Sequence, residues 1–70
     1  MTQPTVGEVI RQKRREAGLT LKDVGEILGV SRMQVSRIER GERALHMRHA
    51  KKLAELFGWE IVKQAVEEQG

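Results

Sequence analysis

The sequence predicts an all-α fold, a compact bundle of four to five short helices. Helix-start signals recur along the chain, each a Ser or Thr followed three residues later by an acidic residue or Gln. Apolar residues after these signals follow the 3.6-residue period of a helix, and glycines follow the apolar stretches. The 70 residues contain no cysteine, so helix packing or a partner chain has to stabilise the fold. A single domain over residues 1–70 is expected.

The first helix is expected to begin at Thr5 and to end at Gly18. Thr5 is followed by Glu8 at the third position, the pattern of a capping box. The glycine can adopt the left-handed conformation that ends a helix. The inner side of this helix is predicted to carry Val6, Ile10 and Ala17.

A helix-turn-helix motif is predicted over residues 20–41. Two helix starts lie eleven residues apart, and the later side chain of each pair is expected to reach back to the first amide: Thr20 with Asp23, and Ser31 with Gln34. Between the two helices, Gly29 is expected to let the chain turn. In the second helix, Val35 and Ile38 fall on the inner side.

The outer side of that second helix predicts contact with DNA bases. Arg can pair with guanine, Gln with adenine, and an apolar tip can meet the methyl group of thymine. The predicted base-contacting residues are Arg32, Met33, Gln34, Ser36 and Arg37. The alternative is an ordinary solvated helix face, with Met33 filling a gap in the core. Two caps, a turn glycine and a buried stripe at helix-turn-helix spacing favour DNA binding, and we expect Met33 to be exposed.

The last third of the chain predicts two further helices. One begins near His46 and closes at Gly58, with an inner side formed by Met47, Ala50, Leu53, Ala54 and Phe57. The other spans residues 59–68 and has two apolar sides, more than a short helix needs to dock on a small core. The excess predicts a homodimer contact through Trp59, Ile61, Val62 and Val66. For the tryptophan, core packing or this contact is favoured over stacking on a base.

Composition and motifs argue against several classes of function. The net charge is +3, and residues 11–48 hold ten Lys or Arg against five acids, so the basic side coincides with the motif. No apolar run is long enough for a membrane span, so a soluble, unexported, cytoplasmic protein is expected. His46 and His49 stand at i and i+3 without an obvious third ligand, so we expect neither metal nor cofactor. Without a nucleophile elbow or a phosphate-binding loop, we expect no enzyme.

With these residues in hand, residues 6–59 resemble the phage lambda repressor-like family, the Cro/CI or XRE type of helix-turn-helix. The strings that carry the resemblance are IRQKRREAGLT, LGVS and VSRIERG. The family implies that the first motif helix crosses the DNA backbone and the second enters the major groove. It implies phosphate contacts, which we expect at Thr20, Lys22, Ser31, Gly41, Arg43 and Arg14. It also implies that Arg14 pairs with Glu39, although a solvated Glu39 is the alternative.

Three positions depart from the family pattern. Leu21 stands where Gln is frequent, so the contact of that Gln to phosphate and to a base-reading neighbour is not expected. Gly25 replaces a usual Ala and permits close helix approach at a helix-propensity cost of about 1 kcal/mol. Leu45-His46 replaces the Pro-Ser that often introduces the next helix.

The expected function is that of a sequence-specific regulator of transcription in a prokaryotic cell or phage, most simply an operator-binding repressor. A single unit reads few base pairs, so a homodimer is expected on a two-fold site with half-site centres roughly 34 Å apart. One alternative is an antitoxin that binds its own operator and a toxin partner. Another is a protein-interaction module without DNA affinity. A phage switch protein and a restriction-modification controller also stay open.

Overall fold

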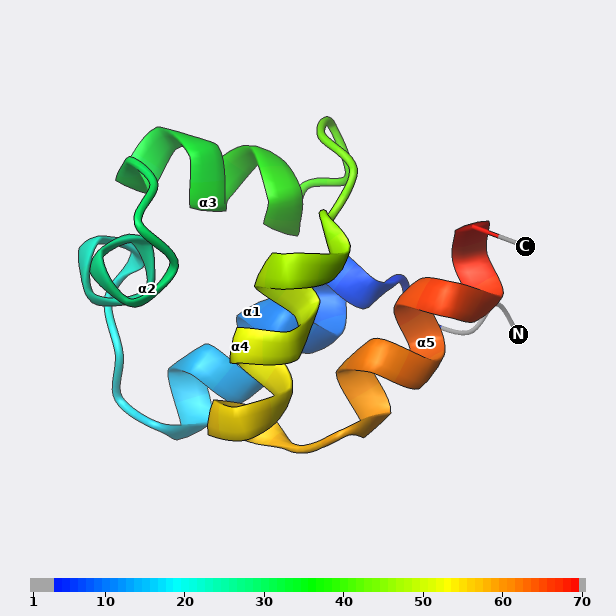
Figure 1. The fold of residues 1–70 in the computed structure, drawn as a ribbon. Helices are drawn as coiled ribbons and strands as arrows, with labels where there is room; N and C mark the ends of the chain where they lie inside the picture. The colour runs from blue at the N-terminus through cyan, green and yellow to red at the C-terminus, as the bar shows by residue number, and fades with distance from the viewer. Residues whose placement is uncertain (1–3, 70) are drawn as a thin grey trace.

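The computed structural model describes residues 4–69, with side chains as far as Glu67, and this part of the chain is entirely helical apart from turns and loops. The five helices are α1 (Val6–Glu16), α2 (Leu21–Leu28), α3 (Arg32–Glu39), α4 (Met47–Phe57) and α5 (Glu60–Gln69). The all-α prediction is confirmed. Figure 1 shows α2 nearly end-on with α3 lying across the top of the molecule, α4 in front of α1, and α5 to one side.

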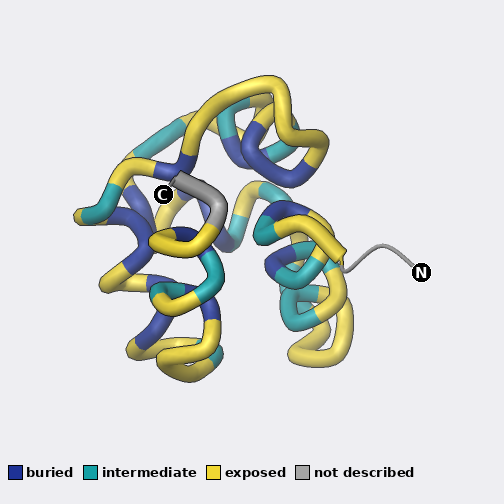
Figure 2. The backbone as a smooth tube through the Cα atoms, turned by 90° about the vertical axis from the view of Figure 1, so that its right-hand side faces the viewer, coloured by how far each residue is buried: buried dark blue, intermediate teal, exposed yellow. Residues whose placement is uncertain are grey.

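One apolar cluster joins all five helices. α2 packs on α3 and α4 packs on α5, while α1 touches α3, α4 and α5. Figure 2 shows the buried positions turned toward the space that the helices enclose. The cluster consists of Ile10, Val24, Leu28, Val35, Ile38, Leu45, Ala50, Leu53, Ile61 and Ala65. Burial of this apolar surface is the main favourable contribution to folding.

The helix starts follow the predicted signals, but only one of the three capping boxes closes. The hydroxyls of Thr5 and Ser31 each accept a hydrogen bond at 3.2 Å from the amide three residues later. At Thr20 the hydroxyl accepts from the Asp23 amide at 3.0 Å, and the Asp23 carboxylate accepts from the Thr20 amide at 2.9 Å. The bond from the Thr20 amide stabilises the charged carboxylate and so lowers the pKa of Asp23. The prediction that Gln34 reaches back to Ser31 is wrong, because its amide faces Arg43 instead.

The turn of the motif depends on two glycines. Gly29 ends α2 in the left-handed region, with a φ of 75°, where side chains other than Gly are strained. The Val30 amide then donates to the Gly25 carbonyl at 2.8 Å. A Cβ atom on Gly25 would stand 2.6 Å from the Val30 carbonyl oxygen, within the distance at which something must shift. This close approach is a physical reason for Gly rather than Ala inside α2.

Two predictions of burial need correction. Ala17 is exposed, because α1 ends at Glu16 and Ala17 is its C-cap, where the chain leaves the helix axis. Ile61 was predicted at the surface of the last helix, yet its side chain is 0% exposed. It packs in the core with Ala65, and Val62 lies half-buried against the same core. An interface through Ile61 is therefore excluded in this arrangement.

Candidate nucleic-acid interface

The inner side of α3 is fixed by apolar packing and by a buried ion pair. Val35 and Ile38 are 1% and 4% exposed. The carboxylate of Glu39, almost fully buried, accepts from Arg14 Nε at 2.7 Å and from Arg14 Nη2 at 3.1 Å. Arg11 Nε adds a longer contact of 3.4 Å. The hydrogen bond to Glu39 raises the pKa of Arg14, which favours the charged guanidinium. The predicted pair is confirmed, and it attaches the end of α3 to α1.

Arg14 and Gly41, two of the predicted phosphate contacts, donate hydrogen bonds within the protein. The Arg14 side chain is only 12% exposed, and its Nη1 donates to the Leu19 carbonyl at 3.0 Å. The Gly41 amide donates to the Ile38 carbonyl at 3.1 Å and closes the end of α3. These internal bonds disfavour phosphate contacts by Arg14 and Gly41, and we do not assign either residue to phosphate.

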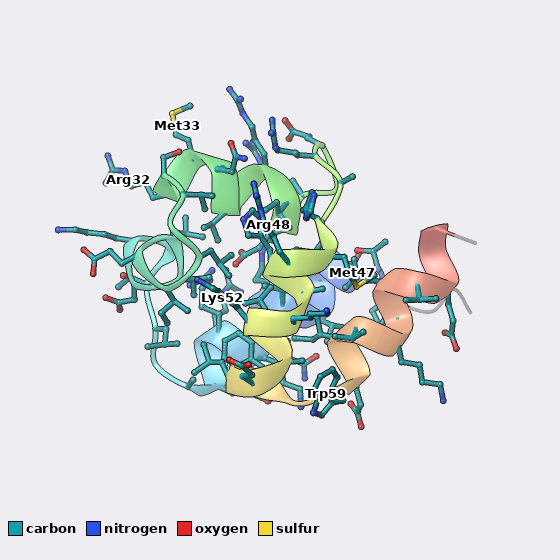
Figure 3. All side chains as sticks on the ribbon, in the orientation of Figure 1. Arg32, Met33, Met47, Arg48, Lys52 and Trp59 are labelled. Carbon is teal, nitrogen blue, oxygen red and sulfur yellow. The ribbon has the colours of Figure 1, made fainter. Side chains whose placement is uncertain are left out.

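The outer side of α3 is open along its length. Met33 is 60% exposed, and Figure 3 shows Arg32 and Met33 projecting from the start of α3 away from the rest of the molecule. Arg37 is exposed one turn further on, and Ser36 is half-buried at the side. The expected exposure of Met33 is confirmed. The contacts of these residues with bases remain predictions.

Arg40 belongs to the same outer side, and sequence reasoning missed it. It follows Met33 and Arg37 at helical spacing and is exposed. Its Nε lies 3.1 Å from a carboxylate oxygen of Glu42, in a pair of which each side chain is about half exposed. The i, i+3 spacing from Arg37 could have revealed it.

Gln34 occupies the other flank of α3, next to the loop that follows the helix. It is half-buried, unlike its neighbours Arg32 and Met33. With the side-chain amide oriented so that its oxygen faces the guanidinium, that oxygen accepts from Arg43 Nε at 2.8 Å and from Arg43 Nη2 at 3.3 Å. A predicted base contact and a predicted phosphate contact are thus paired with each other.

The remaining predicted phosphate contacts lie at two helix starts. Thr20 and Lys22 are exposed at the start of α2, and Ser31 is exposed at the start of α3. Helix N-termini carry partial positive charge and free amides that suit phosphate. At the start of α2 the carboxylate of Asp23 already accepts from the Thr20 amide. The positive charge of Lys22 is therefore what favours phosphate at this segment.

A hollow of about 450 Å³ separates α3 from the start of α4. Its polar lining consists of Gln34, Arg43, His46, Arg48 and His49. His46 caps α4, its Nδ1 accepting from the Arg48 amide at 3.2 Å, and the two imidazole rings are 6.0 Å apart. His49 is 8% exposed. Burial, and then the positive charge of Arg48, lower the pKa of His49.

Among residues 4–67 no group of three or more His, Cys, Asp or Glu side chains is placed to hold a metal ion. No described helix is both long enough and apolar enough to cross a membrane.

The fold and this surface define the class of helix-turn-helix DNA-binding domains. Two helices meet at a glycine turn, and the second exposes Arg and Met side chains while its inner side is fixed to the core. The sequence model of the family described as "Helix-turn-helix" matches residues 10–63. The chain therefore belongs to the XRE-type, lambda repressor-like helix-turn-helix family of DNA-binding transcriptional regulators.

Similar proteins occur in Pyrobaculum aerophilum and Saccharolobus solfataricus. A protein of Pyrobaculum aerophilum, named as a candidate HTH-type transcriptional regulatory protein, is 45% identical over 58 residues, which are 83% of this chain and 23% of the relative. A protein of Saccharolobus solfataricus with the same kind of name is 34% identical over 83% of this chain and 19% of its own length. The chain spans about a fifth of the length of these curated relatives. No solved structure is a significant match.

Proposed function

We propose that this chain is a sequence-specific, double-stranded DNA-binding regulator of transcription whose α3 enters the major groove. The observation that carries the proposal is the division of α3 into two sides: Val35, Ile38 and Glu39 hold the helix on the core, while Arg32, Met33 and Arg37 remain exposed. The printed names of the relatives support a regulatory role. The simplest mode of action is repression, in which the bound domain blocks polymerase from an operator.

The proposed contacts divide into base readers and phosphate contacts. Arg32, Met33, Ser36 and Arg37 are assigned to base edges, where arginine can pair with guanine through two hydrogen bonds. Lys22, Arg43 and the exposed caps Thr20 and Ser31 are assigned to phosphates, which position the domain without reading sequence.

Selection of bound sequences from a random duplex pool tests the proposal. A recovered consensus would show sequence-specific binding, and Arg37→Ala should then weaken binding to that consensus by about 1 to 3 kcal/mol and relax the preference at one base pair. Lys63→Ala is the matched control, because Lys63 is an exposed cation on α5. It should leave both the affinity and the base preference close to those of the unsubstituted protein.

Two results would contradict the proposal. If no consensus emerges, or if Arg37→Ala and Lys63→Ala weaken cognate and random DNA by equal factors, α3 does not read sequence.

We also propose that two copies associate through the exposed side of α5 to read a two-fold operator. Trp59 and Val66 are 66% and 51% exposed, and Val62 lies between them at helical spacing. The surface therefore consists of Trp59, Val62 and Val66, without Ile61. Exposed apolar side chains that gather on one helix side are typical of a contact surface.

Native mass in solution tests the dimer. The unsubstituted chain should run as a dimer, and Trp59→Ala combined with Val66→Asp should give a folded monomer, while Lys63→Ala should stay dimeric. A dimer that survives the double substitution would rule this surface out. A monomeric chain that forms a stoichiometric complex with a protein encoded beside it would favour the antitoxin alternative.

A further inference from the structure

The pair formed by Gln34 and Arg43 joins the recognition helix to the loop behind it. With its side-chain amide in the orientation that turns the oxygen toward the guanidinium, as the surrounding donors require, Gln34 accepts from two nitrogens of Arg43, at 2.8 Å from Nε and 3.3 Å from Nη2. A carboxamide oxygen has two lone pairs, so this fork of donors occupies its acceptor capacity. The remaining N–H groups of Arg43 are left for a ligand, and Arg43 is exposed.

The position of Gln34 agrees with this role. Its side chain is half-buried and lines the hollow between α3 and α4, whereas Met33 and Arg37 are exposed on the outer side. The backbone N–H of Gln34 donates to the Ser31 hydroxyl, but the side chain of Gln34 makes no capping bond back to the Ser31 amide. Both observations place the carboxamide toward the loop.

This arrangement conflicts with direct reading of a base by Gln34. To recognise adenine through two hydrogen bonds, a Gln side chain needs its oxygen to accept from N6 and its amino group to donate to N7. Here that oxygen is bonded to a cation, and charge-assisted hydrogen bonds are stronger than neutral ones. Reading adenine in that way would require the bond to Arg43 to break.

We propose that Gln34 is a positioning residue: its amide oxygen holds Arg43 so that the free N–H groups of the guanidinium meet a phosphate of the DNA backbone beside the major groove. The proposal rests on the DNA-binding function proposed above. An unrestrained arginine side chain loses conformational entropy about several rotatable bonds when it binds a ligand. Holding its side chain in advance lowers that cost, which strengthens binding to every sequence alike. Gln34 thereby contributes to affinity without choosing a base.

A double-mutant cycle on the selected operator tests the proposal. Gln34→Met keeps the length of the side chain and removes its acceptor, and Arg43→Met removes the cation. Arg43→Met should weaken binding by on the order of tenfold and lower the slope of affinity against salt by about one unit. Gln34→Met should weaken binding by roughly threefold to tenfold, by the same factor on every duplex with one base pair changed. In the Arg43→Met background it should have no further effect.

Two outcomes would overturn the inference. One is a Gln34→Met protein that loses discrimination at a single base pair, as expected of a direct reader. The other is an equal loss from Gln34→Met with and without Arg43. Thermal midpoints of all variants, measured beside these titrations, should stay within a few degrees, because the pair lies at an exposed loop.

Arg37→Ala, run in parallel, separates this inference from the proposed function. If Arg37→Ala changes one base preference while Gln34→Met behaves as a base reader, the function stands and the positioning role is wrong. If the unsubstituted protein shows no sequence preference at all, the proposed function fails and takes the positioning role with it.

Discussion

The helices α3 and α5 are similar in length, with eight and ten residues. The sequence of α3 predicts which of its sides is buried, whereas the sequence of α5 does not. In α3 the apolar residues form one narrow stripe, and the structure buries the predicted pair, Val35 and Ile38. In α5 apolar residues occur on two sides, and the structure buries Ile61 while it leaves Trp59 exposed. A single stripe identifies the buried side of a helix, whereas two stripes leave the choice to the neighbouring helices.

The reason lies in what each helix packs against. The polar outer side of α3 makes only one orientation favourable, since burial of Arg32 or Arg37 without a partner would be costly. In α5 apolar side chains are available on both sides, so the sequence pattern alone does not decide which side docks on α4 and α1. The smaller side chains of Ile61 and Ala65 fill the space between these helices, and the tryptophan stays outside.

The largest expected effect comes from a charge on the buried stripe of α5. Ile61→Asp should destabilise the domain by about 5 kcal/mol, because it removes a fully buried side chain and places a carboxylate in the core. A domain of this size has little more stability than that, so urea denaturation should show a chain that is largely unfolded before urea is added.

Lys63→Asp is the matched substitution at an exposed position of the same helix outside the proposed dimer surface, and it should change the free energy of unfolding by less than about 0.5 kcal/mol. If the two substitutions were equally destabilising, the assignment of the buried side of α5 would be wrong.

The next effect tests the ion pair that fixes α3. Glu39→Ala should cost about 3 kcal/mol, because it leaves the guanidinium of Arg14 buried without its carboxylate. Glu42→Ala removes the partner of the half-exposed Arg40 and should cost less than about 1 kcal/mol.

Chemical denaturation of both variants measures this difference between a buried and an exposed pair. A loss from Glu39→Ala no larger than that from Glu42→Ala would contradict a role of the Arg14 pair in holding α3.

The smallest effect concerns pH. Burial and nearby cations lower the pKa of His49 in the folded state below the value of about 6.5 that is usual for histidine, so between the two pKa values the unfolded chain binds more protons than the folded one. Stability due to neutral His49 is therefore fully present above pH 6.5 and decreases as the pH falls toward the folded-state pKa. Urea midpoints between pH 7.5 and 4.5 should fall less steeply in His49→Gln. Identical pH profiles would show that His49 does not contribute.

Local signals in the sequence were sufficient for the helices and for much of the candidate surface. The hydroxyls of Thr5, Thr20 and Ser31 act as predicted because a cap involves residues only three positions apart. The same signals could not predict the role of Gln34, because its competing partner Arg43 comes from a loop nine positions further along the chain. The burial of His49 was missed because its side chain faces the hollow beside α3 and the pattern of α4 already had enough apolar residues.

The sequence by itself determined where the helices begin, where the chain turns at Gly29, and which side of α3 is exposed, because each of these depends on side chains within one or two turns of each other. Only the tertiary structure decided that Arg14 is used inside the protein, that Gln34 holds Arg43, and that Ile61 and not Trp59 is buried. Those outcomes depend on which distant groups come within hydrogen-bond or packing distance, and such distances exist only once the helices have packed.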